Sequence, residues 1–265
     1  MTHLLFISML LFAVLLSACN LEESSAHLDA QHPAVDTITL LPDFAAIKDT
    51  KTKKKAFFDF LRPVIRAENA KVAKSRLRMF AIATSIDNGD AVSKQDQQWL
   101  KRLARKYHVD MKSMHDEQVW RLLKRRVDTV PFRLALAQAA NESSWGTSRF
   151  AREGRNLFGE WCFKPGCGIV PARRSAGMTH EVAVFKSVNE SVASYIYHLN
   201  RVDIYLPLRM ARRDERKWGN KPTAHDLAGG LTGYSERGEA YVDDIRRMIR
   251  VNYDLMSGTE TKNPA

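Results

Sequence analysis

The sequence predicts a mainly α-helical fold with one small β-hairpin lobe, preceded by a helical N-terminal region. Two observations lead to this fold class. Apolar residues recur at helical spacing in several stretches, most of which begin at a serine, an aspartate or a proline. Strand-like alternation is confined to one short segment, residues 168–187.

Changes in composition divide the 265 residues into five segments. We expect, in order, a signal peptide, a flexible tether, a basic helical region, the main domain and a disordered tail, at residues 1–18, 19–50, 51–128, 129–256 and 257–265. No Gly/Ser-rich linker separates the third segment from the fourth, so we expect these two to pack together.

The amino terminus carries the pattern of an export signal. Residues 4–16 form an apolar run that is short for a transmembrane helix and of the right length for a signal-peptide core. Leu16–Cys19 resembles a bacterial lipoprotein box, whose cysteine is lipidated after cleavage. A plain signal peptide that ends near a cysteine is the alternative. We expect an exported protein on the periplasmic face of a bacterial membrane, attached through lipidated Cys19.

The charge balance points to an anionic partner. The formal net charge is +11, and residues 1–18 contain no Lys, Arg, Asp or Glu. Such an excess favours nucleic acid, a membrane surface or an acidic cell-wall polymer. Because an export signal argues against cytoplasmic nucleic acid, we expect no nucleic-acid partner.

Two cysteines remain once Cys19 is set aside. Cys162 and Cys167 flank a Pro-Gly turn, and an oxidising compartment would permit a disulfide that pins this loop. Zinc binding and two free thiols are the alternatives, but no second Cys/His pair stands at ligand spacing. No phosphate-binding or dinucleotide motif is found, and we expect no metal and no cofactor.

Helix signals begin in the basic region. After Lys51 an apolar face recurs at helical spacing, and Pro63 is expected to kink this helix or to start a new one. Ser93 is the expected N-cap of a second helix. A third helix is expected over residues 116–126.

The next helix carries the main candidate for chemistry. Pro131 suits its first turn and Gly146 its end. Leu134, Gln138 and Glu142 follow each other at four-residue intervals, nearly on one face. A glutamate in that last turn is either an ordinary solvated helix end or a carboxyl group held for catalysis.

The block QAANESSWGTSRFAREGRNLFGEW, residues 138–161, resembles the signature of the glucosaminidase family of bacterial wall hydrolases (glycoside hydrolase family 73), especially its Bax-like members. The family pattern is Q-A-x-x-E-S-x-W-G-x-S followed by N-L-F-G. The resemblance covers roughly residues 129–256. It implies a lysozyme-like, mainly helical fold with a small β-lobe, and cleavage of the β-1,4 bond after N-acetylglucosamine in peptidoglycan.

The resemblance implies roles for three residues. Glu142 takes the place of the catalytic acid, and Glu181, in the predicted hairpin, that of a second carboxylate. Tyr234 takes the place of the first tyrosine in the family's Y-A-T-D-P-x-Y stretch. Glu181 could also be an ordinary strand glutamate, and rivals for its role stand elsewhere: Glu160, Glu190 and Glu236. Of these Glu190 is the weakest, because it belongs to a capping box that opens a helix after Ser187.

Four residues are expected to bind sugar. Trp145 and Phe158 could stack on sugar rings, although Phe158 also suits a core position. Asn156 could position a sugar or cap the turn. Tyr241 replaces the family's second tyrosine, but the Asp-Pro is missing and the spacing is one residue longer, so packing within the last helix is the alternative.

The sequence therefore predicts a monomeric endo-β-N-acetylglucosaminidase that acts on peptidoglycan glycan strands. A lytic transglycosylase is one alternative, although its usual G-A-x-G-L-M-Q stretch is replaced here by N-L-F-G. A non-catalytic, lipid-tethered peptidoglycan-binding scaffold is another. A serine nucleophile lacks a histidine base at suggestive spacing, and no H-E-x-x-H motif is present.

Overall fold

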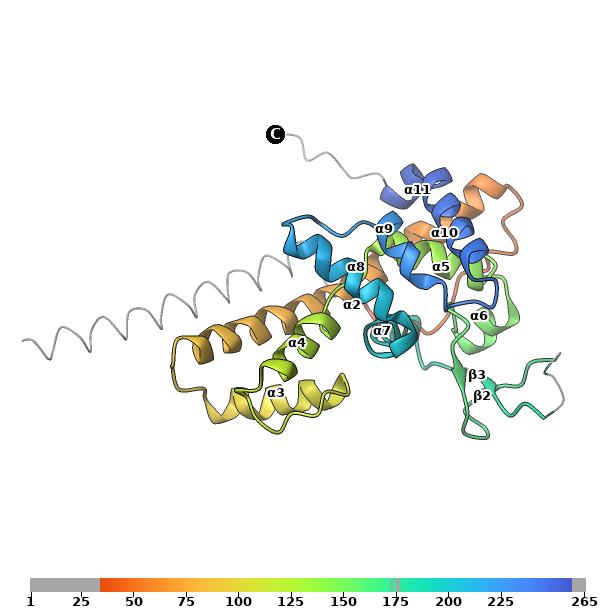
Figure 1. Cartoon of the computed structure of the whole chain (residues 1–265). Coiled ribbons are helices and arrows are strands. Elements are labelled where there is room, and N and C mark those ends of the chain that lie inside the picture. Colours follow the sequence, from red (N-terminus) through yellow and green to blue (C-terminus); the bar gives the residue numbers. More distant parts are fainter. Residues whose placement is uncertain (1–33, 173, 175–176, 259–265) are drawn as a thin grey trace, which may run out of the picture. The chain divides into compact units, whose positions relative to one another are not determined.

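The structure is a computed structural model that describes residues 34–172, 174 and 177–258 (Figure 1). The expected signal peptide, Cys19 and most of the expected C-terminal tail lie outside these residues. The described part is mainly helical and contains a small antiparallel sheet, so the predicted fold class is confirmed. Across these ranges, no helix combines the length and apolar character needed to span a membrane.

The chain forms two compact units. One comprises residues 70–128 and the other residues 35–69 together with 129–258. Helix α2 (Thr50–Asp87) contributes its second half to the first unit and its first half to the second. The two units thus meet in the sequence at residues 128–129 and again within α2, so residues 50–69 belong to the same unit as the later part of the chain.

The first unit also contains α3 (Lys94–Lys106) and α4 (Glu117–Arg126). Helix α3 begins after Ser93, the N-cap that the sequence indicates, and α4 begins at Glu117, one residue after its expected start. The Ser93 side chain accepts a hydrogen bond from the backbone N–H of Asp96 (3.1 Å), and the Asp116 side chain caps α4. Each cap satisfies a backbone donor that the first helical turn cannot satisfy itself.

Helix α2 does not end at Pro63, contrary to one expectation from the sequence. Pro63 lies on the exposed side of the helix, where water can bind the carbonyl group that its missing N–H leaves unpaired. The neighbouring side chains of Leu61, Val64 and Ile65 are fully buried. Their packing outweighs the local preference of proline and keeps the segment helical.

The first half of α2 belongs to the core of the second unit. Phe57 and Phe58 are fully buried there. Asn69 forms a reciprocal pair with Val130: its amide donates to the Val130 carbonyl (2.8 Å) and its oxygen accepts from the Val130 N–H (2.9 Å). Arg62 donates to the carbonyl groups of Leu255 and Met256, near the end of the described chain.

Helix α5 lies at the centre of the second unit. Every residue from Leu134 to Ala140 is buried, and alanines on this helix let neighbouring helices approach closely. It packs against α9 and α10 (Figure 1). The helices of this unit after α2 are α5 (Phe132–Glu142), α6 (Arg149–Gly154), α7 (Val188–Arg201), α8 (Leu206–Lys217), α9 (Ala224–Ala228), α10 (Glu239–Val251) and α11 (Tyr253–Ser257).

The small lobe is a sheet of β1 (Trp161–Cys162), β2 (Gly168–Ile169) and β3 (Glu181–Ala183) in the order β1-β3-β2, with antiparallel neighbours. The hairpin predicted from the sequence is present as β2 and β3. Strand β1 was not predicted, because two residues are too few to show an alternating pattern. Gly168 is required here, since a Cβ at this position would lie 2.0 Å from the Val182 carbonyl oxygen.

The turn after α5 depends on Gly146. Its φ of +76° is in the left-handed region. A Cβ on Gly146 would lie 2.6 Å from Cδ2 of Phe44, whose ring is buried. The turn that follows the candidate acid therefore has both a backbone and a packing reason for glycine.

We expect Gly146→Ala to destabilise the protein by about 2–4 kcal/mol, the sum of left-handed strain and overpacking. Gly219→Ala is a matched control, because Gly219 has the same φ of +76° with no neighbouring atom within 4 Å. The control should lose only about 1 kcal/mol. Urea unfolding measures both losses, and equal losses would show that the contact with Phe44 is unimportant.

Candidate active site

Glu142 is the last residue of α5, and its side chain is half-buried. Its Oε1 atom accepts two hydrogen bonds, from the hydroxyl of Tyr241 on α10 (2.8 Å) and from the amide of Asn141 (3.1 Å). Its Oε2 atom faces Gly159, where a built Cβ would lie 3.9 Å away. One carboxyl oxygen is thus held by the protein, and the other lies beside a residue without a side chain.

A chain of buried hydrogen bonds holds Tyr241 in position to donate to Glu142. The Tyr195 hydroxyl on α7 donates to Gln138 Oε1 (2.6 Å), and Gln138 Nε2 donates to the Tyr241 hydroxyl (2.9 Å). Tyr241 must therefore direct its own proton at Glu142. Gln138 and Tyr195 are fully buried, and breaking such a chain would leave a buried polar group without a partner.

Aromatic rings surround the same carboxyl group. Tyr234 and Tyr241 are stacked at a centroid distance of 5.4 Å, and Phe158 and Tyr195 at 3.9 Å. The Tyr234 hydroxyl donates to the Phe158 carbonyl (2.8 Å). Burial, and then the charge of Glu142, raise the pKa of Tyr241. Tyr241 therefore stays a protonated donor across the physiological pH range.

Asn156 orders the segment that brings Gly159 to Glu142. Its amide donates to the carbonyls of Glu160 (2.9 Å) and Ala183 (3.0 Å). Its oxygen accepts from the N–H groups of Phe158 (3.3 Å) and Glu160 (3.1 Å). The side chain is buried, and all its hydrogen-bonding capacity is used within the protein.

Trp145 and Phe158 have different surroundings. Trp145 is half-buried and packs edge-on against Phe57 and Phe58, at 5.9 and 5.2 Å between centroids. The ammonium group of Lys54 lies 5.0 Å from its ring. Phe158 is buried, in the stack with Tyr195. Of these two side chains, Trp145 is therefore the one that is partly exposed to solvent.

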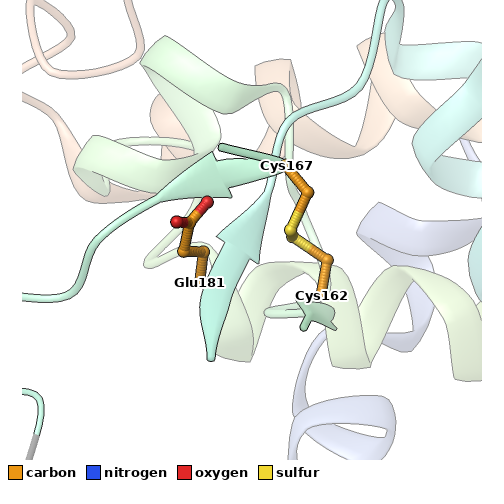
Figure 2. Close-up of side chains that lie close together, drawn as sticks. All are labelled: Cys162, Cys167 and Glu181. Atoms are coloured by element: carbon orange, nitrogen blue, oxygen red, sulfur yellow. A yellow bond between two sulfur atoms is a disulfide. The ribbon is translucent and has the colours of Figure 1, made fainter. Parts of the chain in front are cut away.

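Glu181 lies in β3, and its contacts join it to the loop closed by the Cys162–Cys167 disulfide (Figure 2). Its two carboxyl oxygens accept from the N–H groups of Gly166 (3.0 Å) and Gly168 (2.7 Å). These backbone hydrogen bonds lower the pKa of Glu181. The structure therefore groups Glu142 with Tyr234 and Tyr241, and groups Glu181 with the disulfide loop.

The sulfur atoms of Cys162 and Cys167 and a carboxyl oxygen of Glu181 lie within 4.8 Å of one another. Such a set would suit a thiophilic cation if the cysteines were thiolates. In the disulfide, however, both sulfurs are covalently joined. The cluster is a disulfide next to a carboxylate.

A third carboxyl group, that of Glu160, lies beside the same tyrosines. The Ser194 hydroxyl donates to its Oε2 (2.8 Å), while its Oε1 is buried without a hydrogen-bond partner. Burial raises the pKa of Glu160 to about 7. The pKa of Tyr205 is raised to about 12 by burial and then by the charges of Glu160 and Glu142. Glu160 thus borders the same aromatic cluster as Glu142.

Several of these residues had no assigned role in the sequence. Gln138 could be placed on the face of Glu142 by its four-residue spacing, but not as the link between two tyrosines. Tyr195 had the helical spacing of an ordinary core residue, and Tyr205 had no distinguishing pattern. Gln138 is 57 residues from Tyr195 and 103 residues from Tyr241, so local periodicity could not reveal this link.

Comparison with known proteins decides the family. Residues 117–254 match the glucosaminidase family, described as mannosyl-glycoprotein endo-beta-N-acetylglucosaminidase. The protein belongs to the glucosaminidase family. The chain is also 32% identical to Protein bax of Escherichia coli (strain K12) over 225 residues, 82% of this chain and 76% of that protein. No solved structure matches it. Membership supports a glycosidase-type activity on peptidoglycan.

We expect Glu160→Gln to stabilise the protein increasingly as the pH rises from about 4.5 to about 7. The unfolded carboxyl group ionises at the lower pH, whereas the folded one keeps its proton until about pH 7. The wild type therefore loses stability across this window, and glutamine does not. Because the carboxyl group is buried while part of the Glu160 residue still contacts solvent, the gain above pH 7 should be about 1–3 kcal/mol.

Thermal and urea unfolding between pH 4 and pH 8 would measure this gain. Glu236→Gln is the control, since Glu236 is exposed. The difference in unfolding free energy between this variant and the wild type should not change with pH. A difference for Glu160→Gln that did not change with pH would contradict the buried, protonated carboxyl group.

Proposed function

We propose that the protein is an endo-β-N-acetylglucosaminidase that hydrolyses the β-1,4 bond after N-acetylglucosamine in peptidoglycan, with Glu142 as the general acid. The observation that carries this proposal is the unequal environment of the two Glu142 oxygens. Oε1 accepts from Tyr241 and Asn141, so a proton on this carboxyl group belongs on Oε2. That oxygen faces Gly159, where no side chain occupies the space.

The proposed acid step uses this asymmetry. A glycosidic oxygen that approaches beside Gly159 takes the proton from Glu142 Oε2 as its bond to the anomeric carbon breaks. The charge left on the carboxylate is then stabilised by the two donors on Oε1. Tyr241 is held in place for this purpose by Gln138.

Glu181 supplies the second carboxylate in this proposal. It is ionised at neutral pH, since its oxygens accept backbone hydrogen bonds. A fixed negative charge can stabilise the cation-like centre or direct the attacking water. The same charge would also support attack by the acetamido group of the substrate, so the proposal does not depend on one of these routes.

The N-terminal sequence and the charge support a location for this activity. We propose that the protein is exported, is attached to the periplasmic face of a bacterial membrane through lipidated Cys19, and acts as a monomer. Its net charge of +11 suits the anionic wall polymer and lipid headgroups.

We expect Glu142→Gln to reduce the release of reducing sugar ends from purified peptidoglycan by at least about 10²-fold, the usual contribution of a general acid. Glu117→Gln, which removes an exposed carboxylate at the start of α4, is the control and should keep full activity. Equal activity of Glu142→Gln and the wild type would rule out the assignment. Anhydro ends in the products would instead identify a lytic transglycosylase, and an inactive wild type would favour a binding scaffold.

We expect Tyr241→Phe to lower kcat about tenfold, because Glu142 loses the donor that stabilises its charge after proton transfer. Folding stability should fall by about 1–3 kcal/mol, since Gln138 Nε2 would be buried without an acceptor. Tyr253→Phe is the control, because Tyr253 is exposed. Reducing-end assays and urea unfolding measure the two effects, and an unchanged kcat would show that Tyr241 only packs.

A further inference from the structure

The loop between β1 and β2 has a specific backbone geometry. Its sequence is Cys-Phe-Lys-Pro-Gly-Cys-Gly, residues 162–168. The Cys167 N–H donates to the Lys164 carbonyl (3.1 Å), and Gly166 has a φ of +78°. Proline at the second position and glycine with positive φ at the third are typical of a type II turn. The turn therefore follows from the Pro165–Gly166 pair.

This turn directs several backbone donors at one carboxylate. Gly166 and Gly168 donate to opposite oxygens of Glu181, and the N–H of Cys167 between them also lowers the pKa of this glutamate. Successive N–H groups that converge in this way form an anion-binding concavity. The Gly166 donor lowers this pKa the most, and the Gly168 donor has the next largest effect.

The disulfide closes this concavity next to the carboxylate. Cys162 is the cross-strand partner of Glu181 in the β1–β3 pair, with antiparallel register. Its bond to Cys167 joins strand β1 to the residue between the two donating glycines. Figure 2 shows the disulfide and the carboxylate on adjacent parts of the sheet. The cross-link thus ties the donor loop to the lobe that carries its acceptor.

We propose that the disulfide loop is the positioning element of the Glu181 carboxylate: the Cys162–Cys167 bond holds the N–H groups of Gly166 and Gly168 around this side chain. The inference rests on the proposed function, in which Glu181 is the second carboxylate. The cysteines and glycines are positioning residues, since they act through Glu181.

The other charged and titratable groups near Glu181 are few in the described part of the lobe. The positive charge of Arg174 also lowers the pKa of Glu181, less than the Gly166 and Gly168 donors do. His180 precedes Glu181 and stacks on Trp161 at 3.9 Å. When the disulfide is opened, Arg174 and His180 remain, so any change in Glu181 reports the loss of the loop.

Opening the disulfide has a defined chemistry. Reduction with dithiothreitol transfers two electrons and two protons to the Cys162–Cys167 bond, gives two thiols and leaves the reagent as its cyclic disulfide. The Pro-Gly turn alone must then hold the donors. The expected result is a more mobile loop and a Glu181 carboxylate that takes up a proton at higher pH.

The test compares the full-length wild type with the Cys162→Ser/Cys167→Ser double variant. Carbon-13 NMR of the glutamate carboxyl groups, assigned with Glu181→Gln, follows the titration of Glu181. We expect its midpoint to rise by about one pH unit in the double variant. We also expect the acidic limb of the pH–rate profile, measured by the release of reducing ends, to shift to higher pH. The rate at neutral pH should be about tenfold lower than that of the wild type.

The outcomes separate the two proposals. If the double variant kept the wild-type titration midpoint of Glu181 and the wild-type acidic limb of the pH–rate profile, the positioning role of the disulfide loop would be overturned. Glu181→Gln with full activity would overturn the catalytic role of Glu181, while the NMR titration still tests the loop. If the double variant does not fold, reduced and reoxidised wild type gives the same comparison. Dithiothreitol added to the folded double variant should change neither measurement.

Discussion

The hydrogen-bond chain from Tyr195 through Gln138 and Tyr241 to Glu142 is the constraint on which the site depends. It joins three helices, α7, α5 and α10, that are distant in sequence. Each tyrosine hydroxyl has one proton, and the Tyr241 oxygen already accepts from Gln138, so the chain ends with the Tyr241 proton directed at Glu142. The alanines of α5 allow these helices to approach closely enough for the chain to form.

On the opposite side of Glu142, the chain presents backbone at Gly159 and no side chain. The side-chain amide of Asn156 holds this segment in place through four hydrogen bonds. The two halves of the site therefore have different physical origins, a buried polar chain on one side and an ordered turn on the other. Both are anchored in the same unit, so the acid keeps one defined orientation.

The sequence predicts well what depends on local chemistry. The caps at Ser93 and Ser187, the end of α5 near Gly146 and the hairpin leading to Glu181 follow from short patterns, and the signature around Glu142 indicates the family. The roles of Gln138 and Glu160 could not be predicted, because they depend on partners brought together by tertiary packing. The continuity of α2 through Pro63 has the same explanation, since burial of its neighbours outweighs a local preference.

The first half of α2 determines how much of the chain a recombinant form of the second unit must include. The family match begins at residue 117, yet Phe57 and Phe58 fill the core of the same unit and Asn69 pairs with Val130. A recombinant fragment trimmed to the matched region would lack the first half of α2 and would expose the apolar surface that this segment covers. Expression boundaries and domain-shuffling experiments should therefore retain the upstream residues from about position 35, although they lie outside the recognised motif.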